Sequence, residues 1–194
     1  MPMDTTILIT IAAAALAGGV LLYAFLRRSA GAAQPAEGSA FRKFGRNIRL
    51  RDLFRLAALI EEAGKDFYAK LELKAANPET KKLCAWLAEE EEQHRLFVQG
   101  HLDRWRVLGT HLTEWPVFLE KVKQEGFYAD PPGENASEEE MAAFAIRQEI
   151  KTAEFYKLFE AAFPEEWKRS RLERLVGEER SHEAKLRAAY PGVK

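Results

Sequence analysis

The sequence has 194 residues, of which 47% are hydrophobic and 30% are charged, and its formal net charge is −1. This composition is typical of a folded chain, and the balanced charge excludes the strongly basic surface of a nucleic-acid-binding protein. The single cysteine, Cys84, excludes an internal disulfide and a Cys-x-x-Cys metal site. The length allows one ordinary domain with an appendage.

Residues 7–26 form an apolar run without a charge, ILITIAAAALAGGVLLYAFL. About twenty helical residues span the core of a bilayer, so this run predicts a transmembrane helix. A cleaved signal peptide is the alternative, but a signal peptide has a basic n-region. Here MPMD precedes the run, and the basic residues follow it, beginning with Arg27 and Arg28. The positive-inside rule therefore predicts a single-pass protein of the cell membrane with its remaining domain in the cytoplasm.

The chain after this run divides into two parts. Residues 29–40 are rich in Ala, Gly, Ser and Pro, which is typical of a flexible linker. From Leu53 onward the apolar residues recur at helical spacing. We therefore predict a transmembrane anchor at 1–28, a linker at 29–48 and a helical domain at 49–190.

Two helices are predicted in the first half of the domain. The apolar stripe of the first helix extends from Leu53 to Leu71. Asn77 and Pro78 then indicate a new helix, because Asn is a favoured N-cap and Pro is favoured at the first helical position. This second helix is expected to continue to about Leu108.

A mixed stretch of some thirty residues separates these helices from the next two. It contains a short predicted helix, 115–124, and a loop with the sequence ADPPGENA. Ser137 and Glu140 have the spacing of a capping box and mark the start of the third helix. Pro164 opens the fourth helix, which ends before Tyr190. Short turns within each pair and one long connection between the pairs predict an all-α, ferritin-like four-helix bundle with one long crossover.

Carboxylates and imidazoles interrupt the apolar stripes of all four helices. Burying an unpaired carboxylate costs many kcal/mol, so buried charges are normally paired or bound to a metal. Two divalent cations would balance four carboxylates, and the pattern therefore predicts a two-metal site in the core. Its candidate ligands are Glu61 on the first helix, Glu91 and His94 on the second, Glu149 on the third, and Glu179 and His182 on the fourth.

The candidate ligands repeat with an offset of 88 residues between the two halves of the domain. In each half, a Glu is followed 30 residues later by Glu-x-x-His, and six and seven residues later by Phe-Tyr. Neighbouring glutamates would allow a one-residue phase error in any single helix, but the shared register argues against it. A Glu from each of two helices and Glu-x-x-His from the other two is the di-metal arrangement of four-helix bundles.

Four segments, EEAGKDFYAKL, EEEEQHRLF, RQEIKTAEFYKLF and GEERSHEAKL, resemble the helix signatures of rubrerythrin-type ferritin-like proteins over roughly residues 50–190. The resemblance implies that the first Glu of each half is a terminal ligand. It also implies that the second Glu bridges the metals, that each histidine binds one metal, and that the protein pairs as a homodimer. The sequence departs from the family at Ile146, where many rubrerythrins add a carboxylate.

Tyr68 and Tyr156 complete the repeat as candidate catalytic residues. They either hydrogen-bond the ligand carboxylates or fill the core beside the adjacent phenylalanines. Carboxylate oxygens with one imidazole per metal favour two Fe ions, with Mn as the alternative, over a zinc site.

The predicted centre belongs to redox chemistry, and the resemblance favours reduction of peroxide or dioxygen with electrons from an external donor. Two alternatives use the same ligands. One is a ferroxidase or iron-binding protein that handles Fe(II) at the membrane. The other is a di-iron hydroxylase that acts on a lipid-soluble substrate.

Overall fold

The structure of the chain is a computed structural model that describes residue 44 and residues 48–103, 115–161 and 166–193. The predicted transmembrane run at 7–26 and the Ala/Gly-rich stretch at 29–40 lie outside these residues. Pro164 and the expected end of the second helix at Leu108 lie outside them as well. Within the described ranges, no helix is long and apolar enough to cross a membrane.

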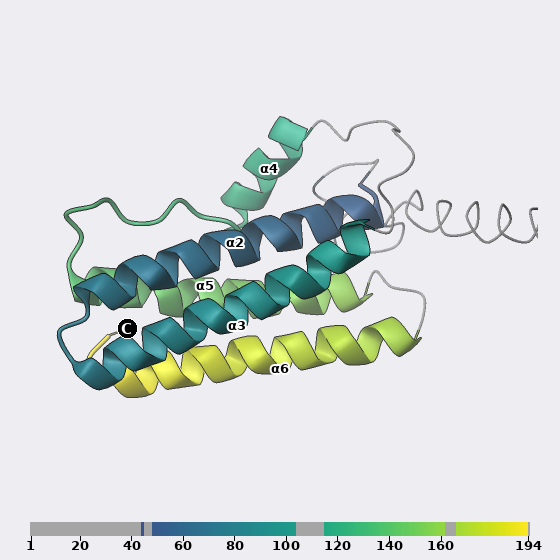
Figure 1. Cartoon of the computed structure of the whole chain (residues 1–194). Helices are drawn as coiled ribbons and strands as arrows, with labels where there is room; N and C mark the ends of the chain where they lie inside the picture. Colours follow the sequence, from purple (N-terminus) through teal and green to yellow (C-terminus); the bar gives the residue numbers. More distant parts are fainter. Residues whose placement is uncertain (1–43, 45–47, 104–114, 162–165, 194) are drawn as a thin grey trace, which may run out of the picture.

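Five helices make up the regular structure of the described residues: α2 (Leu50–Lys74), α3 (Pro78–Asp103), α4 (Trp115–Gln124), α5 (Glu138–Ala161) and α6 (Glu166–Ala189). The four long helices lie side by side as a bundle, and α4 lies outside it next to α2 (Figure 1). Helices α2 and α3 are antiparallel neighbours, as are α5 and α6. The connection that contains α4 joins the two pairs, so that α5 runs antiparallel to α2. The predicted helical bundle is confirmed.

Local side-chain hydrogen bonds define where two of these helices begin. The Asn77 side chain accepts a hydrogen bond from the backbone N–H of Glu79 at 2.8 Å, directly before the first turn of α3. At α5, Glu140 accepts from the Ser137 N–H at 2.8 Å, and the Ser137 hydroxyl accepts from the Glu140 N–H at 3.1 Å. This is the reciprocal capping box that the sequence predicts.

The apolar core is divided into two clusters. The first cluster fills one half of the bundle and includes Leu53, Leu56, Val98, Phe155, Phe159 and Leu172. The second cluster fills the other half and includes Phe67, Leu71, Leu87, Ala145 and Leu186. Complete burial of one such Leu or Phe side chain contributes about 1.5–3 kcal/mol. The middle of the bundle, between the two clusters, is where polar side chains face inward.

The first cluster extends beyond the four long helices. Phe44 and Ile48 are each 3% exposed, and the Phe44 ring lies 6.2 Å from that of Phe118 in α4. The Arg55 guanidinium of α2 lies 4.0 Å from the centre of the Trp115 ring, a cation–π contact that also joins α4 to the bundle. The domain boundaries predicted from the sequence assign both Phe44 and Ile48 to the linker, whereas the structure packs their side chains in the core of the domain.

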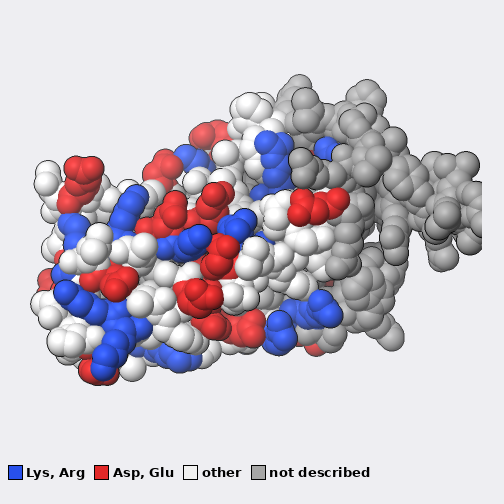
Figure 2. All heavy atoms as spheres, viewed as in Figure 1, with Lys and Arg blue, Asp and Glu red and all other residues white. Residues whose placement is uncertain are grey.

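The outer surface of the domain carries charges of both signs. Figure 2 shows Lys and Arg interspersed with Asp and Glu over the visible face of the described residues. Local pairs account for part of this pattern, such as Glu92 with Lys65 at 3.0 Å and with Arg95 at 2.7 Å. Exposed pairs of this kind contribute roughly 0–1 kcal/mol each, so they are not what fixes the fold.

Candidate metal centre

The six predicted ligands converge in the middle of the bundle, although they come from four different helices. Each of them is at most 4% exposed. The helices bring them together because each residue occupies a core-facing position on its helix, between the two apolar clusters. From α2 comes Glu61, from α3 come Glu91 and His94, from α5 comes Glu149, and from α6 come Glu179 and His182.

The His94 ring faces carboxylates at both of its nitrogens. Its Nδ1 atom lies 3.0 Å from Oε1 of Glu179 and 3.5 Å from Oε2 of Glu61. Its Nε2 atom lies 3.2 Å from Oε2 of Glu178. Nδ1 is therefore directed at the shared carboxylates of the centre, whereas Nε2 is directed outward at a separate carboxylate.

The His182 ring occupies the corresponding place in the second half. Its Nδ1 atom lies 3.6 Å from Oε1 of Glu91, 3.6 Å from Oε2 of Glu149 and 3.8 Å from Oε2 of Glu179. The rings of His182 and His94 are stacked with their centroids 5.6 Å apart. Both histidines thus approach one common group of carboxylates.

The ligand atoms form two overlapping groups, each compact enough to hold a cation. Glu91, Glu149, Glu179 and His182 each offer an atom within 4.8 Å of the others, and so do Glu61, Glu91 and His94. Glu91 belongs to both groups. A carboxylate with two oxygens that is shared in this way has the geometry needed to bridge two ions.

Two tyrosines hold the carboxylates that do not follow the Glu-x-x-His pattern. The Tyr68 hydroxyl donates a hydrogen bond to Oε1 of Glu149, and the Tyr156 hydroxyl donates to Oε1 of Glu61. Burial, followed by the charge of the bonded glutamate, raises the pKa of each tyrosine well above its usual value. Both hydroxyls therefore remain protonated at neutral pH and serve as donors. Each bond crosses from one helix pair to the other.

The buried glutamates and His94 of the centre shift one another's pKa values. Burial, and then the charges of Glu179 and Glu61, raises the pKa of Glu91 well above its usual range. Burial, and then Glu149 and Glu61, does the same to the pKa of Glu179. Burial alone would lower the pKa of His94, but contact with Glu61 outweighs it and raises that pKa to about 9. Burial alone would raise the pKa of Glu61, but the polar contact with His94 outweighs burial, so the pKa of Glu61 is lowered.

The donor set fits bound cations. Among the described residues, no Lys or Arg forms an ion pair with any of the four glutamates at the centre. Oxygens of Glu61, Glu149 and Glu179, together with both ring nitrogens of each histidine, are buried without a hydrogen-bond partner. Buried atoms of this kind are normally satisfied by a partner or an ion. A metal placed among them would supply the missing partner for the carboxylate oxygens and for the inward-facing Nδ1 atom of each histidine.

Three further residues lie against the centre, and the sequence did not predict any of them as part of it. Glu178 faces Nε2 of His94, as described above, and Trp86 lies edge-on to the His182 ring at 5.4 Å. A Cβ atom at Gly64 would lie only 2.9 Å from Oε2 of Glu91, so this close approach depends on glycine. Helical periodicity places Gly64 and Glu178 near the stripes, but it contains no signal for these contacts.

Comparison with known proteins bears on this geometry. The family model described as Rubrerythrin matches residues 52–190. The chain belongs to the rubrerythrin family. A solved structure of a hypothetical protein from Pyrococcus furiosus is similar, with a TM-score of 0.60 and 23% identity over 81% of this chain and 94% of that chain. This likeness shows the ferritin-like fold alone. No curated protein matches the chain.

Membership of the rubrerythrin family agrees with a buried site of glutamates and histidines that is able to hold metal. The family match covers all six candidate ligands and both tyrosines. At Ile146, the position where the sequence departs from the additional carboxylate of many rubrerythrins, this chain buries an isoleucine in the second apolar cluster. The third helix therefore offers one carboxylate to the centre at these positions, and the two halves provide equal numbers of ligands.

Proposed function

We propose that the protein is a di-iron oxidoreductase that reduces peroxide with electrons from a separate donor. The observation that carries this proposal is the convergence of two Glu plus Glu-x-x-His sets on one buried space, with Glu91 common to both groups. Four carboxylates balance two divalent ions. When bound, two Fe(II) ions supply one electron each, which together are the two electrons needed to cleave the O–O bond of peroxide.

The protein's own residues would hold the ions and control their surroundings. Glu61 and Glu149 would each hold one ion, and each of these carboxylates accepts a hydrogen bond from a tyrosine of the opposite helix pair. Glu91 and Glu179, which carry the Glu-x-x-His pattern, would be shared between the two ions. Tyr68 and Tyr156 keep their protons at neutral pH and donate to Glu149 and Glu61, so they would orient these two ligands. The apolar clusters at either end limit the access of water.

The proposal includes a location at the cell membrane. Its support is the uncharged run at 7–26 with basic residues on its C-terminal side, a pattern that favours a cytoplasmic domain. The full chain is expected in the membrane fraction, and a chain without residues 1–28 in the soluble fraction. Recovery of the full chain in the soluble fraction would refute the anchor without affecting the metal centre.

The reaction is tested with the full chain in detergent, loaded anaerobically with two equivalents of Fe(II). Stopped-flow mixing with hydrogen peroxide, and separately with dioxygen, compares the two rates of iron oxidation. The proposal expects peroxide to be faster by orders of magnitude and one equivalent to oxidise both irons. Equally fast oxidation by dioxygen, with continued turnover of excess Fe(II), would replace this function by iron handling as a ferroxidase.

A further inference from the structure

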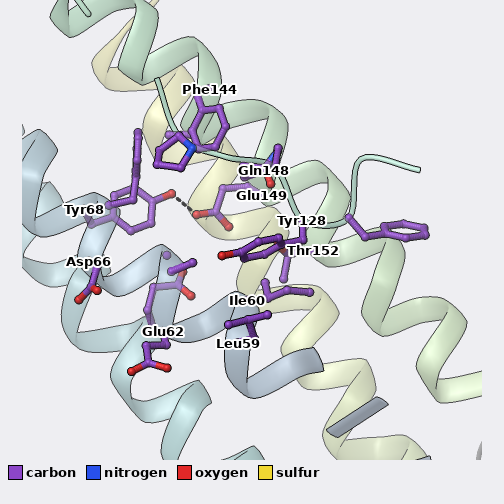
Figure 3. Close-up of a pocket in the computed structure, with 18 of the residues that line it drawn as sticks. Leu59, Ile60, Glu62, Asp66, Tyr68, Tyr128, Phe144, Gln148, Glu149 and Thr152 are labelled. Atoms are coloured by element: carbon purple, nitrogen blue, oxygen red, sulfur yellow. Dashed lines mark hydrogen bonds between the residues drawn. The ribbon is translucent and has the colours of Figure 1, made fainter. Parts of the chain in front are cut away.

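A cavity of about 330 Å³ lies beside the metal centre, between α2, α5 and the connection that leads to α5 (Figure 3). Its inner end reaches Glu91, Glu149 and Tyr68, which belong to the centre. The segment around Tyr128 forms its outer wall, and Figure 3 shows this side chain directed toward the space between the two helices. A molecule in the cavity would therefore touch the metal-binding carboxylates from one side.

The absence of a side chain at Gly64 opens this side of the centre. Gly64 lines the cavity, and even a methyl group there would come within 2.9 Å of Oε2 of Glu91. The corresponding residue in the second half of the domain is Thr152, which also lines the cavity. The first half thus has no side chain where the second half has a threonine. Without a side chain at Gly64, Glu91 reaches the wall of the cavity.

The cavity is larger than peroxide or dioxygen requires. One water molecule takes up about 30 Å³ of liquid, so the space corresponds to roughly ten waters. Pockets for small organic ligands begin at about 300 Å³. A single aromatic ring with one or two substituents matches this size, whereas a long lipid chain does not.

The wall is aromatic and apolar over most of its area. Phe67 and Phe144 have ring centroids 5.0 Å apart and stand on facing helices, and Phe127 lies on the connection. Aromatic rings at such a spacing attract another ring by offset or edge-on stacking. The remaining apolar lining comes from Leu59, Ile60, Ala63, Ala129, Pro131 and Ala145.

The charges around the cavity disfavour an anion. Glu62 and Asp66 are exposed at its α2 side, and Lys70 is the single cationic residue among its described lining residues. The apolar wall penalises a cation as well, because a charge placed there would lose its hydration. A neutral molecule meets neither penalty. The Gln148 amide and the Tyr128 hydroxyl remain to bind one polar substituent.

We propose that this cavity binds a neutral molecule with one aromatic ring and a hydroxyl group, directly beside the metal-binding carboxylates. Its ring packs among Phe67, Phe127 and Phe144, and its hydroxyl group bonds at Gln148 or Tyr128. The inference goes beyond the proposed function, because reduction of peroxide does not by itself need an organic pocket.

The test is equilibrium dialysis of radiolabelled phenol against the full chain in detergent, both metal-free and loaded anaerobically with Fe(II). Empty micelles measure the background. Ala63→Phe fills the cavity from α2, and Ala69→Phe places the same side chain at an exposed position of the same helix. Benzoate is the anionic probe of equal ring size. Circular dichroism confirms the helical content of each variant.

The expected result is saturable binding of phenol by the wild-type chain and by Ala69→Phe, with at least tenfold weaker binding by Ala63→Phe. Benzoate is expected to bind at least tenfold more weakly than phenol. If Ala63→Phe does not fold, Gln148→Phe blocks the cavity from α5 and takes its place. Absence of saturable phenol binding, or equal binding by a folded cavity-filling variant, overturns the proposal. The peroxide reaction of the same wild-type sample shows separately whether the proposed function holds.

Discussion

Gly64→Ala is expected to change metal affinity and the stability of the metal-free protein in opposite directions. Gly64 lies in the interior of α2, where replacing Gly with Ala stabilises a helix by about 0.5–1 kcal/mol. The new methyl group, however, would lie 2.9 Å from Oε2 of Glu91, whereas ordinary contacts begin at 3.4 Å. In the metal-free protein the Glu91 side chain can rotate away at little cost.

The same movement is costly once Glu91 holds metal. The carboxylate must shift by about 0.5 Å, whereas metal–ligand distances tolerate about 0.2 Å. Disturbing the support of a ligand typically lowers metal affinity by about 10–100-fold, or roughly 1.4–2.8 kcal/mol. We therefore expect tighter folding without metal and weaker binding of Fe(II).

Urea unfolding in the presence of a chelator measures the first quantity, and anaerobic competition with a chromophoric Fe(II) chelator measures the second. Gly177→Ala is the matched control, because Gly177 lies within α6 only two residues before Glu179 and a Cβ there meets nothing within 4 Å. It should raise stability to the same extent and leave metal affinity unchanged. Unchanged affinity in Gly64→Ala would refute the assignment of Glu91 as a constrained ligand.

Three further predictions concern the centre itself. Glu91→Ala combined with Glu179→Ala should reduce bound iron from about two per chain to near zero by elemental analysis, while circular dichroism shows that the helices persist. Full occupancy would contradict the bridging roles. Tyr156→Phe leaves the buried Glu61 carboxylate without its donor, so urea unfolding of the metal-free protein should show a loss of about 1.5–3 kcal/mol; an unchanged midpoint would mean that water replaces the hydroxyl. The pKa of His94 is raised from 6.5 to about 9 on folding, so its contribution is present below pH 6.5 and lost as the pH rises through 9. Stability of the metal-free protein should therefore fall by roughly 3 kcal/mol over this range, and His94→Gln should flatten the profile.

The sequence predicts which charged side chains converge in the core because two independent periodicities agree. Helical spacing selects core-facing positions, and the offset of 88 residues removes the choice between adjacent glutamates such as Glu90, Glu91 and Glu92. The structure buries Glu91 and leaves Glu90 and Glu92 partly exposed. The starts of α3 and α5 are predictable for a different reason: Asn77, like Ser137 with Glu140, acts on the adjacent backbone, so no tertiary information is needed.

The surroundings of the ligands are not predictable in this way. The contact between Gly64 and Glu91 joins the neighbouring helices α2 and α3, and spacing along one helix cannot reveal how closely two helices approach. Phe44 and Ile48 lie before the helical period begins, so their burial against α4 leaves no pattern in the sequence. The cavity depends on how the connection around Tyr128 packs over α2 and α5, which is also a tertiary property.

The different neighbours of the two histidines make the halves of the centre chemically distinct. Glu178 stands behind His94, whereas the Trp86 ring stands beside His182. A negative charge 3.2 Å from the outer nitrogen makes an imidazole ring a stronger electron donor to metal, whereas a neutral indole ring does not. The two positions should therefore fill in sequence rather than at random. At one equivalent of metal, the population would consist mainly of a single half-loaded species with its ion on the His94 side.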